Sequence, residues 1–149
     1  MSSPKQNRIP TPSHPFKHVM PIQLRFNDID IFGHVNNAMY LQFFDLGKLR
    51  YLEDVLGKDF VKKGFTAVIV NINCDFFSST FIDENIEVRT AVVGFGEKSL
   101  TLEQRIVNCD TDDVKCQCRT IMAGFDSATM TSVPIPTIFR ETIKSYESL

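Results

Sequence analysis

The sequence lacks several features that would indicate a partner or a compartment. Its 149 residues include no tryptophan, and 16 Lys and Arg stand against 18 Asp and Glu, a net charge of −2. Without an excess of positive charge, we expect no nucleic-acid partner and no anionic membrane surface as a partner. No apolar run approaches the roughly 20 residues of a membrane span, and the N-terminal segment is too polar for a signal peptide.

Cysteine is also scarce. The four thiols, at positions 74, 109, 116 and 118, form no C-x-x-C pair, which argues against a zinc ribbon or a thioredoxin-like redox motif. Cys116 and Cys118 would share one face of a strand, where a free cysteine packs as a small apolar residue. We therefore expect free, partly buried thiols, no metal, no cofactor and a cytoplasmic protein.

What is present fits one globular domain, since 43% of the residues are hydrophobic and 23% are charged. Residues 1–19 carry four prolines, which remove backbone donors and oppose helix. We predict a proline-rich arm over 1–19, the folded domain over 20–133 and a tail over 134–149. In the tail, Thr137 can cap a short helix.

In the first half of the predicted domain, the spacing of apolar residues changes once, from a strand pattern to a helix pattern. Residues Pro21 to Asn27 alternate apolar and polar, which predicts a half-buried strand. A loop containing Gly33 follows, and Asn37 is a favoured helix cap. From Ala38 to Leu56 the residues are apolar around much of the circumference, which predicts a long helix buried on most sides and ended by Gly57.

The second half alternates with a period of two. Four strands are predicted over 68–76, 86–92, 100–106 and 114–125, and the turn residues between them favour an antiparallel meander. Only the long helix is apolar enough to cover one face of this sheet. The predicted fold class is α+β: a curved antiparallel sheet of about five strands wrapped around one central helix, the hot-dog fold. One helix leaves sheet edge exposed, so we expect a dimer.

One segment carries a motif. Residues 25–45 resemble the first strand, loop and helix of the 4-hydroxybenzoyl-CoA thioesterase-like family, whose signature is Asp-x-x-Gly followed by His-Val-Asn-Asn and an aromatic residue. Here Asp30, Gly33, His34, Asn37 and Tyr40 occupy that pattern. The resemblance implies hydrolysis of an acyl- or aryl-CoA thioester to the free acid and CoA. It also implies homodimers or homotetramers with active sites at the subunit interface.

The chemistry of these residues agrees with the resemblance. A helix N-terminus has unpaired N–H groups and a partial positive charge, so it can hold the oxyanion formed when a thioester is attacked. Asp30 precedes such an end, where a carboxylate can attack the carbonyl or activate a water. The resemblance assigns this role to Asp30 and suggests the Asn37 backbone N–H as the donor to the thioester oxygen.

Other interpretations of the motif remain open. Asp28 and Asp30 can form Asx turns that lead into the helix, and His34 can either bind substrate or hold the loop through backbone contacts. His34 paired with Asp30 would also suit a hot-dog hydratase or dehydratase, and a third possibility is a non-catalytic acyl-CoA-binding protein. Several basic residues that could hold CoA phosphates are scattered on the predicted strands: Arg89, Lys98, Arg105, Lys115 and Arg119.

Overall fold

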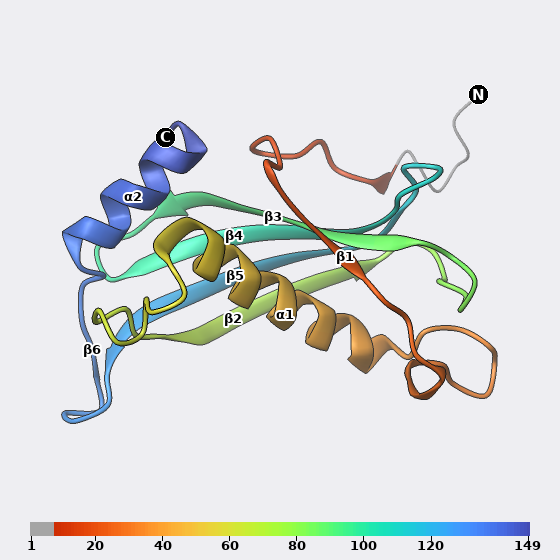
Figure 1. The fold of residues 1–149 in the computed structure, drawn as a ribbon, viewed down its shortest axis with the longest axis horizontal. Helices are drawn as coiled ribbons and strands as arrows, with labels where there is room; N and C mark the ends of the chain where they lie inside the picture. The colour runs from red at the N-terminus through yellow and green to blue at the C-terminus, as the bar shows by residue number, and fades with distance from the viewer. Residues whose placement is uncertain (1–7) are drawn as a thin grey trace.

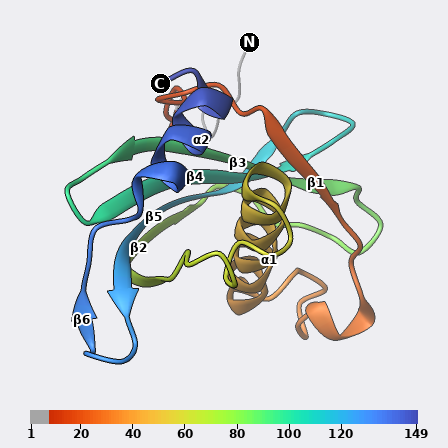
Figure 2. The same ribbon diagram turned by 60° about the vertical axis from the view of Figure 1, so that its left-hand side comes forward.

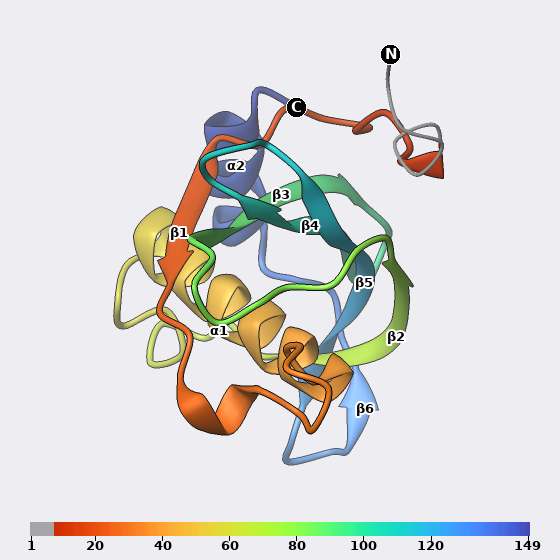
Figure 3. The ribbon, with the colours of Figure 1, turned by 90° about the vertical axis from the view of Figure 1, so that its right-hand side faces the viewer.

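A computed structural model describes residues 8–149 and shows an antiparallel sheet curved around one long helix, α1 (Asn37–Leu56) (Figure 1). The strands are β1 (His18–Ile22), β2 (Ala67–Phe76), β3 (Ile86–Phe95), β4 (Ser99–Asn108), β5 (Val114–Asp126) and the short β6 (Thr131–Ser132), and a second helix, α2 (Thr137–Glu147), closes the chain. The predicted α+β architecture of a curved sheet around one central helix is confirmed (Figure 3).

The order of strands differs from the predicted meander. Along the sheet the order is β1, β3, β4, β5 and β2, with β6 paired only to β5. β2 therefore lies at one edge of the sheet. The segment between Phe76 and Ile86 then crosses the ends of β5 and β4 before the chain enters β3 (Figure 3). The alternation of the sequence predicted each long strand, but it contains no information about which strands pair.

The first strand also lies earlier than predicted. β1 occupies His18–Ile22 and pairs with β3 from His18 opposite Thr90 to Ile22 opposite Ile86. The prediction of a strand reaching Asn27 is wrong, because Phe26–Asp28 form a 3₁₀ turn. The Asp28 carboxylate accepts hydrogen bonds from the Arg25 backbone N–H at 2.8 Å and from the Arg25 guanidinium at 3.1 Å, and these bonds end the extended chain.

The core lies between α1 and the concave face of the sheet. Figure 2 shows α1 lying across the sheet, with α2 near its far end. Towards the start of α1, Tyr40, Phe43 and Phe44 pack against β3, β4 and β5, and towards its end Tyr51 and Leu52 pack against the sheet and α2. Cys116 and Cys118 belong to this core, while Cys74 is half-buried and Cys109 is exposed. All four cysteines are free, as predicted.

Gly47 allows the helix to approach the sheet closely. A Cβ atom at this position would lie 2.6 Å from Val88 Cγ1 and 3.0 Å from Gln104 Nε2. Gln104 donates hydrogen bonds to the Phe44 carbonyl and to the Thr90 hydroxyl, both at 3.0 Å, so it has little freedom to move aside. Glycine is therefore required here by packing.

We expect Gly47→Ala to lower the free energy of unfolding. Overpacking of a filled core costs about 1–3 kcal/mol, which exceeds the gain of at most about 1 kcal/mol in helix propensity. The matched control is Gly94→Ala in β3, since a Cβ there meets nothing within 4 Å. Urea denaturation measures both, and a Gly47→Ala protein as stable as the control would show that this contact relaxes freely.

The outer face of α1 is more exposed than predicted. Its buried residues lie along one side, whereas Leu41, Leu46 and Leu49 are 39%, 47% and 46% exposed. The prediction of a helix buried on most sides is therefore wrong for the single chain. The apolar surface that the sequence predicted is present, but part of it faces outwards.

The described part of the N-terminal segment runs along the sheet. Ser13 donates a hydrogen bond to Glu103 at 2.7 Å, and His14 Nε2 lies 2.9 Å from the fully buried carboxylate of Glu147 in α2. The Tyr51 hydroxyl donates to the same carboxylate at 2.9 Å. Burial raises the pKa of Glu147, although the hydrogen bond from Tyr51 and the nearby His14 ring oppose that shift. These contacts join both ends of the described chain to α1 and the sheet.

Two kinds of feature are absent from residues 8–149. No helix there is long and apolar enough to cross a membrane. Within the same range, no group of three or more His, Cys, Asp or Glu side chains is arranged to hold a metal ion.

Candidate functional site

The loop before α1 is held by hydrogen bonds centred on Asp30. Its carboxylate accepts the backbone N–H of Phe32 at 2.9 Å and that of His34 at 3.3 Å. Its own N–H donates to the His34 carbonyl at 2.8 Å, and Gly33, with φ of +80°, donates to the Asp30 carbonyl at 3.1 Å. Asp30 thus forms the Asx turn that the sequence allowed, and its side chain remains partly exposed.

The start of α1 leaves one backbone donor free. Asn36 is the N-cap, and its side chain accepts the N–H of Ala38 at 2.9 Å, while its carbonyl accepts the N–H of Met39. Within residues 8–149 the Asn37 N–H has no hydrogen-bond acceptor. An unpaired N–H at a helix N-terminus is the kind of donor that stabilises an oxyanion.

This free donor stands beside a pocket of about 220 Å³. The pocket is lined by Asn37 and Tyr40 of α1 and by the chain that leaves β2, namely Phe76, Phe77, Ser78 and Ser79. Tyr40 is fixed there because its hydroxyl donates to the Thr80 hydroxyl at 2.9 Å inside the protein. The pocket therefore brings together the helix start and the end of the edge strand.

The three predicted site residues do not occupy one wall. Asn37 lines the pocket, whereas Asp30 and His34 lie on the adjoining loop and are not among the lining residues. The His34 ring packs edge-on against the Phe81 ring, with 5.0 Å between centroids, and the two residues form an isolated β-bridge. In the described structure the His34 ring makes no hydrogen bond to the Asp30 carboxylate. Its contacts with Phe81 instead help to hold the loop in place.

The second aspartate of the motif is part of the framework. Asp28 is fully buried, and both of its carboxylate oxygens accept bonds from Arg25. Its carbonyl also accepts the N–H of Asn36 at 2.8 Å, which fastens the two ends of the loop. The interpretation of Asp28 as a residue that structures the loop agrees with these contacts.

A larger pocket of about 430 Å³ opens between β1 and α1. It is mainly apolar and is lined by Pro21, Ile22, Gln23, Arg25, Met39, Gln42, Phe43 and Leu46. Phe43 belongs both to the core and to this wall. Met39 lies two residues after Asn37, so this pocket borders the same end of the helix.

Most of the basic residues that could bind CoA phosphates instead contact other residues of the protein. Arg89 pairs with Glu87 and Asp112, and these hydrogen bonds raise its pKa against the opposing effect of burial. Arg105 donates to Gln117 at 2.7 Å and to the Pro10 carbonyl. Lys115 is buried beside Glu84. None of the three lines either pocket described above.

The sequence of the folded domain matches a known family. Residues 24–143 match the model of the thioesterase-like superfamily, so the chain belongs to that family. The curved sheet around α1 is the hot-dog fold that thioesterase structures share. The predicted resemblance to the 4-hydroxybenzoyl-CoA thioesterase-like family is confirmed, and the family and fold together indicate a thioester hydrolase.

Individual proteins are similar to this chain in structure or in sequence. A thioesterase from Thermus thermophilus, solved in complex with coenzyme A and zinc, superposes with a TM-score of 0.78 at 24% identity, covering 90% of this chain and 97% of that one. The PA5185 protein of Pseudomonas aeruginosa gives a TM-score of 0.78 at 27% identity, covering 87% and 91%. The uncharacterised protein YsmA of Bacillus subtilis is 25% identical over 87 residues, and the match spans 58% of each chain.

Proposed function

We propose that this protein is an acyl-CoA thioesterase, which hydrolyses an acyl- or aryl-CoA thioester to the free acid and CoA. The observation that carries the proposal is the free Asn37 N–H at the start of α1, on a pocket wall, with the Asp30 loop directly before it. Family membership supports thioester hydrolysis, and a solved structure of the same fold contains coenzyme A.

In the proposed mechanism, the thioester carbonyl oxygen accepts the Asn37 N–H. The helix N-terminus then stabilises the negative charge that develops on this oxygen during attack. Asp30 either attacks the carbonyl carbon to form an anhydride, which water then opens, or takes a proton from a water that attacks directly. Both routes break the carbon–sulfur bond, and CoA leaves as a thiolate that takes up a proton.

We infer further that the active form is a homodimer, or a dimer of dimers, assembled along β2. Within residues 8–149 this strand pairs only with β5, which leaves its other edge open. The apolar residues exposed along it are Val68, Ile69, Val70, Ile72 and Phe76. The opposite edge strand, β1, is short and contains Pro21, which lacks the N–H needed for a ladder. Phe76 also lines the pocket at the helix start, so a copy paired along β2 would border that pocket.

The test is a substrate panel with two readouts. The protein is incubated with acyl-CoAs of increasing chain length, with aryl-CoAs and with an enoyl-CoA, and free CoA is followed with a thiol reagent while enoyl absorbance is followed in parallel. We expect thiol release well above the uncatalysed rate with at least one substrate. A change in enoyl absorbance without thiol release would indicate a hydratase, and binding without either change would indicate an acyl-CoA-binding protein.

A further inference from the structure

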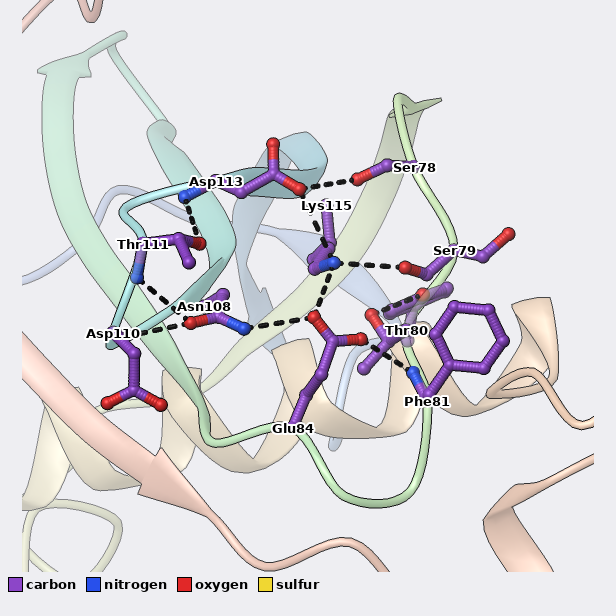
Figure 4. A network of polar contacts seen from close by, with 11 residues as sticks. Ser78, Ser79, Thr80, Phe81, Glu84, Asn108, Asp110, Thr111, Asp113 and Lys115 are labelled. Carbon is purple, nitrogen blue, oxygen red and sulfur yellow. Dashed lines mark hydrogen bonds and ion pairs between the residues drawn. The ribbon is translucent and has the colours of Figure 1, made fainter.

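An ion pair between a buried lysine and a partly buried glutamate lies behind one wall of the candidate site. Lys115 in β5 is 5% exposed, and its ammonium lies 2.7 Å from Glu84 Oε1 and donates to the Ser79 carbonyl at 3.0 Å (Figure 4). The Lys115 carbonyl accepts the N–H groups of Phe77 and Ser78. One residue of the sheet therefore contacts three successive residues of the segment that leaves β2.

Glu84 extends this contact to the end of the segment. Its second oxygen accepts the Phe81 N–H at 2.7 Å, and Oε1 also accepts the Asn108 side-chain amide at 2.9 Å (Figure 4). Partial burial alone would raise the pKa of Glu84, but the bonds from Lys115, Phe81 and Asn108 outweigh burial and hold the pKa below its ordinary value. The carboxylate is therefore charged at neutral pH and remains paired with the ammonium.

Asp113 adds a second carboxylate, from the β4–β5 turn. It accepts the Ser78 hydroxyl at 3.1 Å and lies 3.4 Å from the Lys115 ammonium. We call Lys115, Glu84, Asn108 and Asp113 the clamp. Its four side chains come from β4, β5 and the two connections beside them, and all of them act on residues 78–81 or on one another (Figure 4).

The other side of the clamped segment contacts the candidate active site directly. The carbonyl of the fully buried Thr80 accepts the Val35 N–H at 2.8 Å, and its hydroxyl accepts the Tyr40 hydroxyl at 2.9 Å. Phe81 pairs with His34 through the β-bridge and the edge-on ring contact. The segment thus lies between the clamp and the residues that hold Asp30 and begin α1.

We propose that Lys115 and Glu84 are positioning residues of the active site, which hold residues 78–81 so that the Asp30 loop and the Asn37 N–H keep their relative placement. The inference rests on the proposed function. Its physical basis is that the buried Lys115 ammonium is stable only when it is paired and hydrogen-bonded, and the partly buried Glu84 carboxylate supplies that pairing. Without the clamp, the segment loses the side-chain bonds at Ser78, Ser79 and Phe81 that set its distance from the sheet.

The expected kinetic effect is on turnover. A displacement of about 1 Å between reacting groups can cost roughly a hundredfold in rate. The attack by Asp30 and the oxyanion contact act in the transition state, so their misplacement lowers kcat more than it changes KM. We expect Glu84→Gln, which keeps the shape of the side chain and removes its charge, to lower kcat by about tenfold or more.

The experiment compares four purified variants with the wild type on its best acyl-CoA substrate. Glu84→Gln and Lys115→Met break the pair, Lys115→Arg keeps the charge, and Lys63→Met removes an exposed ammonium that pairs with Asp59 on the surface. We expect the first two to lose kcat with KM changed by less than about threefold, Lys115→Arg to recover most of the kcat lost in Lys115→Met, and Lys63→Met to match the wild type.

Hydrogen exchange of the Val35 amide, read by NMR, gives a second readout that needs no activity. We expect faster exchange in Glu84→Gln and Lys115→Met, because the acceptor at Thr80 is no longer held in place. A lower melting temperature with unchanged kcat would overturn the proposal, and so would unchanged exchange at Val35. If exchange rises as expected but the wild type hydrolyses no thioester, the proposed function fails while the clamp stands.

Discussion

Asp30→Asn is expected to fold normally and to lose about a hundred- to ten-thousand-fold in kcat, the range typical for removal of a general base. The fold should persist because the asparagine carbonyl oxygen can still accept the N–H groups of Phe32 and His34. The charge needed for attack, or for activation of a water, is lost. Steady-state kinetics with the best acyl-CoA should show the loss in kcat with KM nearly unchanged.

Two other asparagine variants act as controls. Asp59→Asn alters an exposed carboxylate of a surface ion pair and should match the wild type. Asp28→Asn should retain more turnover than Asp30→Asn but unfold at a lower temperature, because Asp28 is fully buried against Arg25. If Asp30→Asn keeps more than about a tenth of wild-type kcat, its carboxylate serves only the Asx turn and the site assignment is wrong.

Val70→Lys in β2 is expected to convert the assembly into monomers at micromolar concentration and to remove most of the turnover. Val70 is 58% exposed on the open edge strand, near its middle. Placing an unpaired charge in a buried interface costs about 3–5 kcal/mol, and each 1.4 kcal/mol is a factor of ten in Kd, so the dimer should weaken by about a hundred- to four-thousandfold. Sedimentation equilibrium and the thiol-release assay measure the two effects.

The matched control carries the same substitution on the opposite edge of the sheet. Val19 in β1 is 46% exposed, and Val19→Lys should leave both the mass in solution and the turnover unchanged. A wild-type protein that sediments as an active monomer would contradict the proposed assembly. A Val70→Lys protein that remains a dimer would show that the interface lies elsewhere.

Local patterns predicted the elements of this fold better than their arrangement. The long helix was predicted to within one residue at its start, and the four long strands were found because their alternation is a property of each strand alone. β1 was misplaced because Leu24 and Phe26 continue the alternation into a segment that Asp28 turns into a 3₁₀ helix. The pairing of β2 with β5 depends on tertiary packing, for which alternation gives no signal.

The same distinction applies to the site. The motif from Asp30 to Asn37 is contiguous, so its residues could be chosen from the sequence. The segment from Ser78 to Phe81 could not be chosen, because its role depends on contacts between Tyr40 and Thr80, 40 residues apart, and between Lys115 and Ser79, 36 residues apart. Lys115 itself was noted only as one of several scattered basic residues, since nothing in the sequence indicates that its ammonium is buried.

The burial of the cysteines has a practical consequence for the thiol-release assay. Reagents that report free CoA react with thiolates, so a protein rich in accessible thiols would add its own signal. Cys116 and Cys118 lie in the core, and burial raises the pKa of Cys74 to about 12, which leaves almost no thiolate at neutral pH. Cys109 is the exposed cysteine, so a folded Cys109→Ser protein should react very little with the thiol reagent and add almost no background signal to the assay.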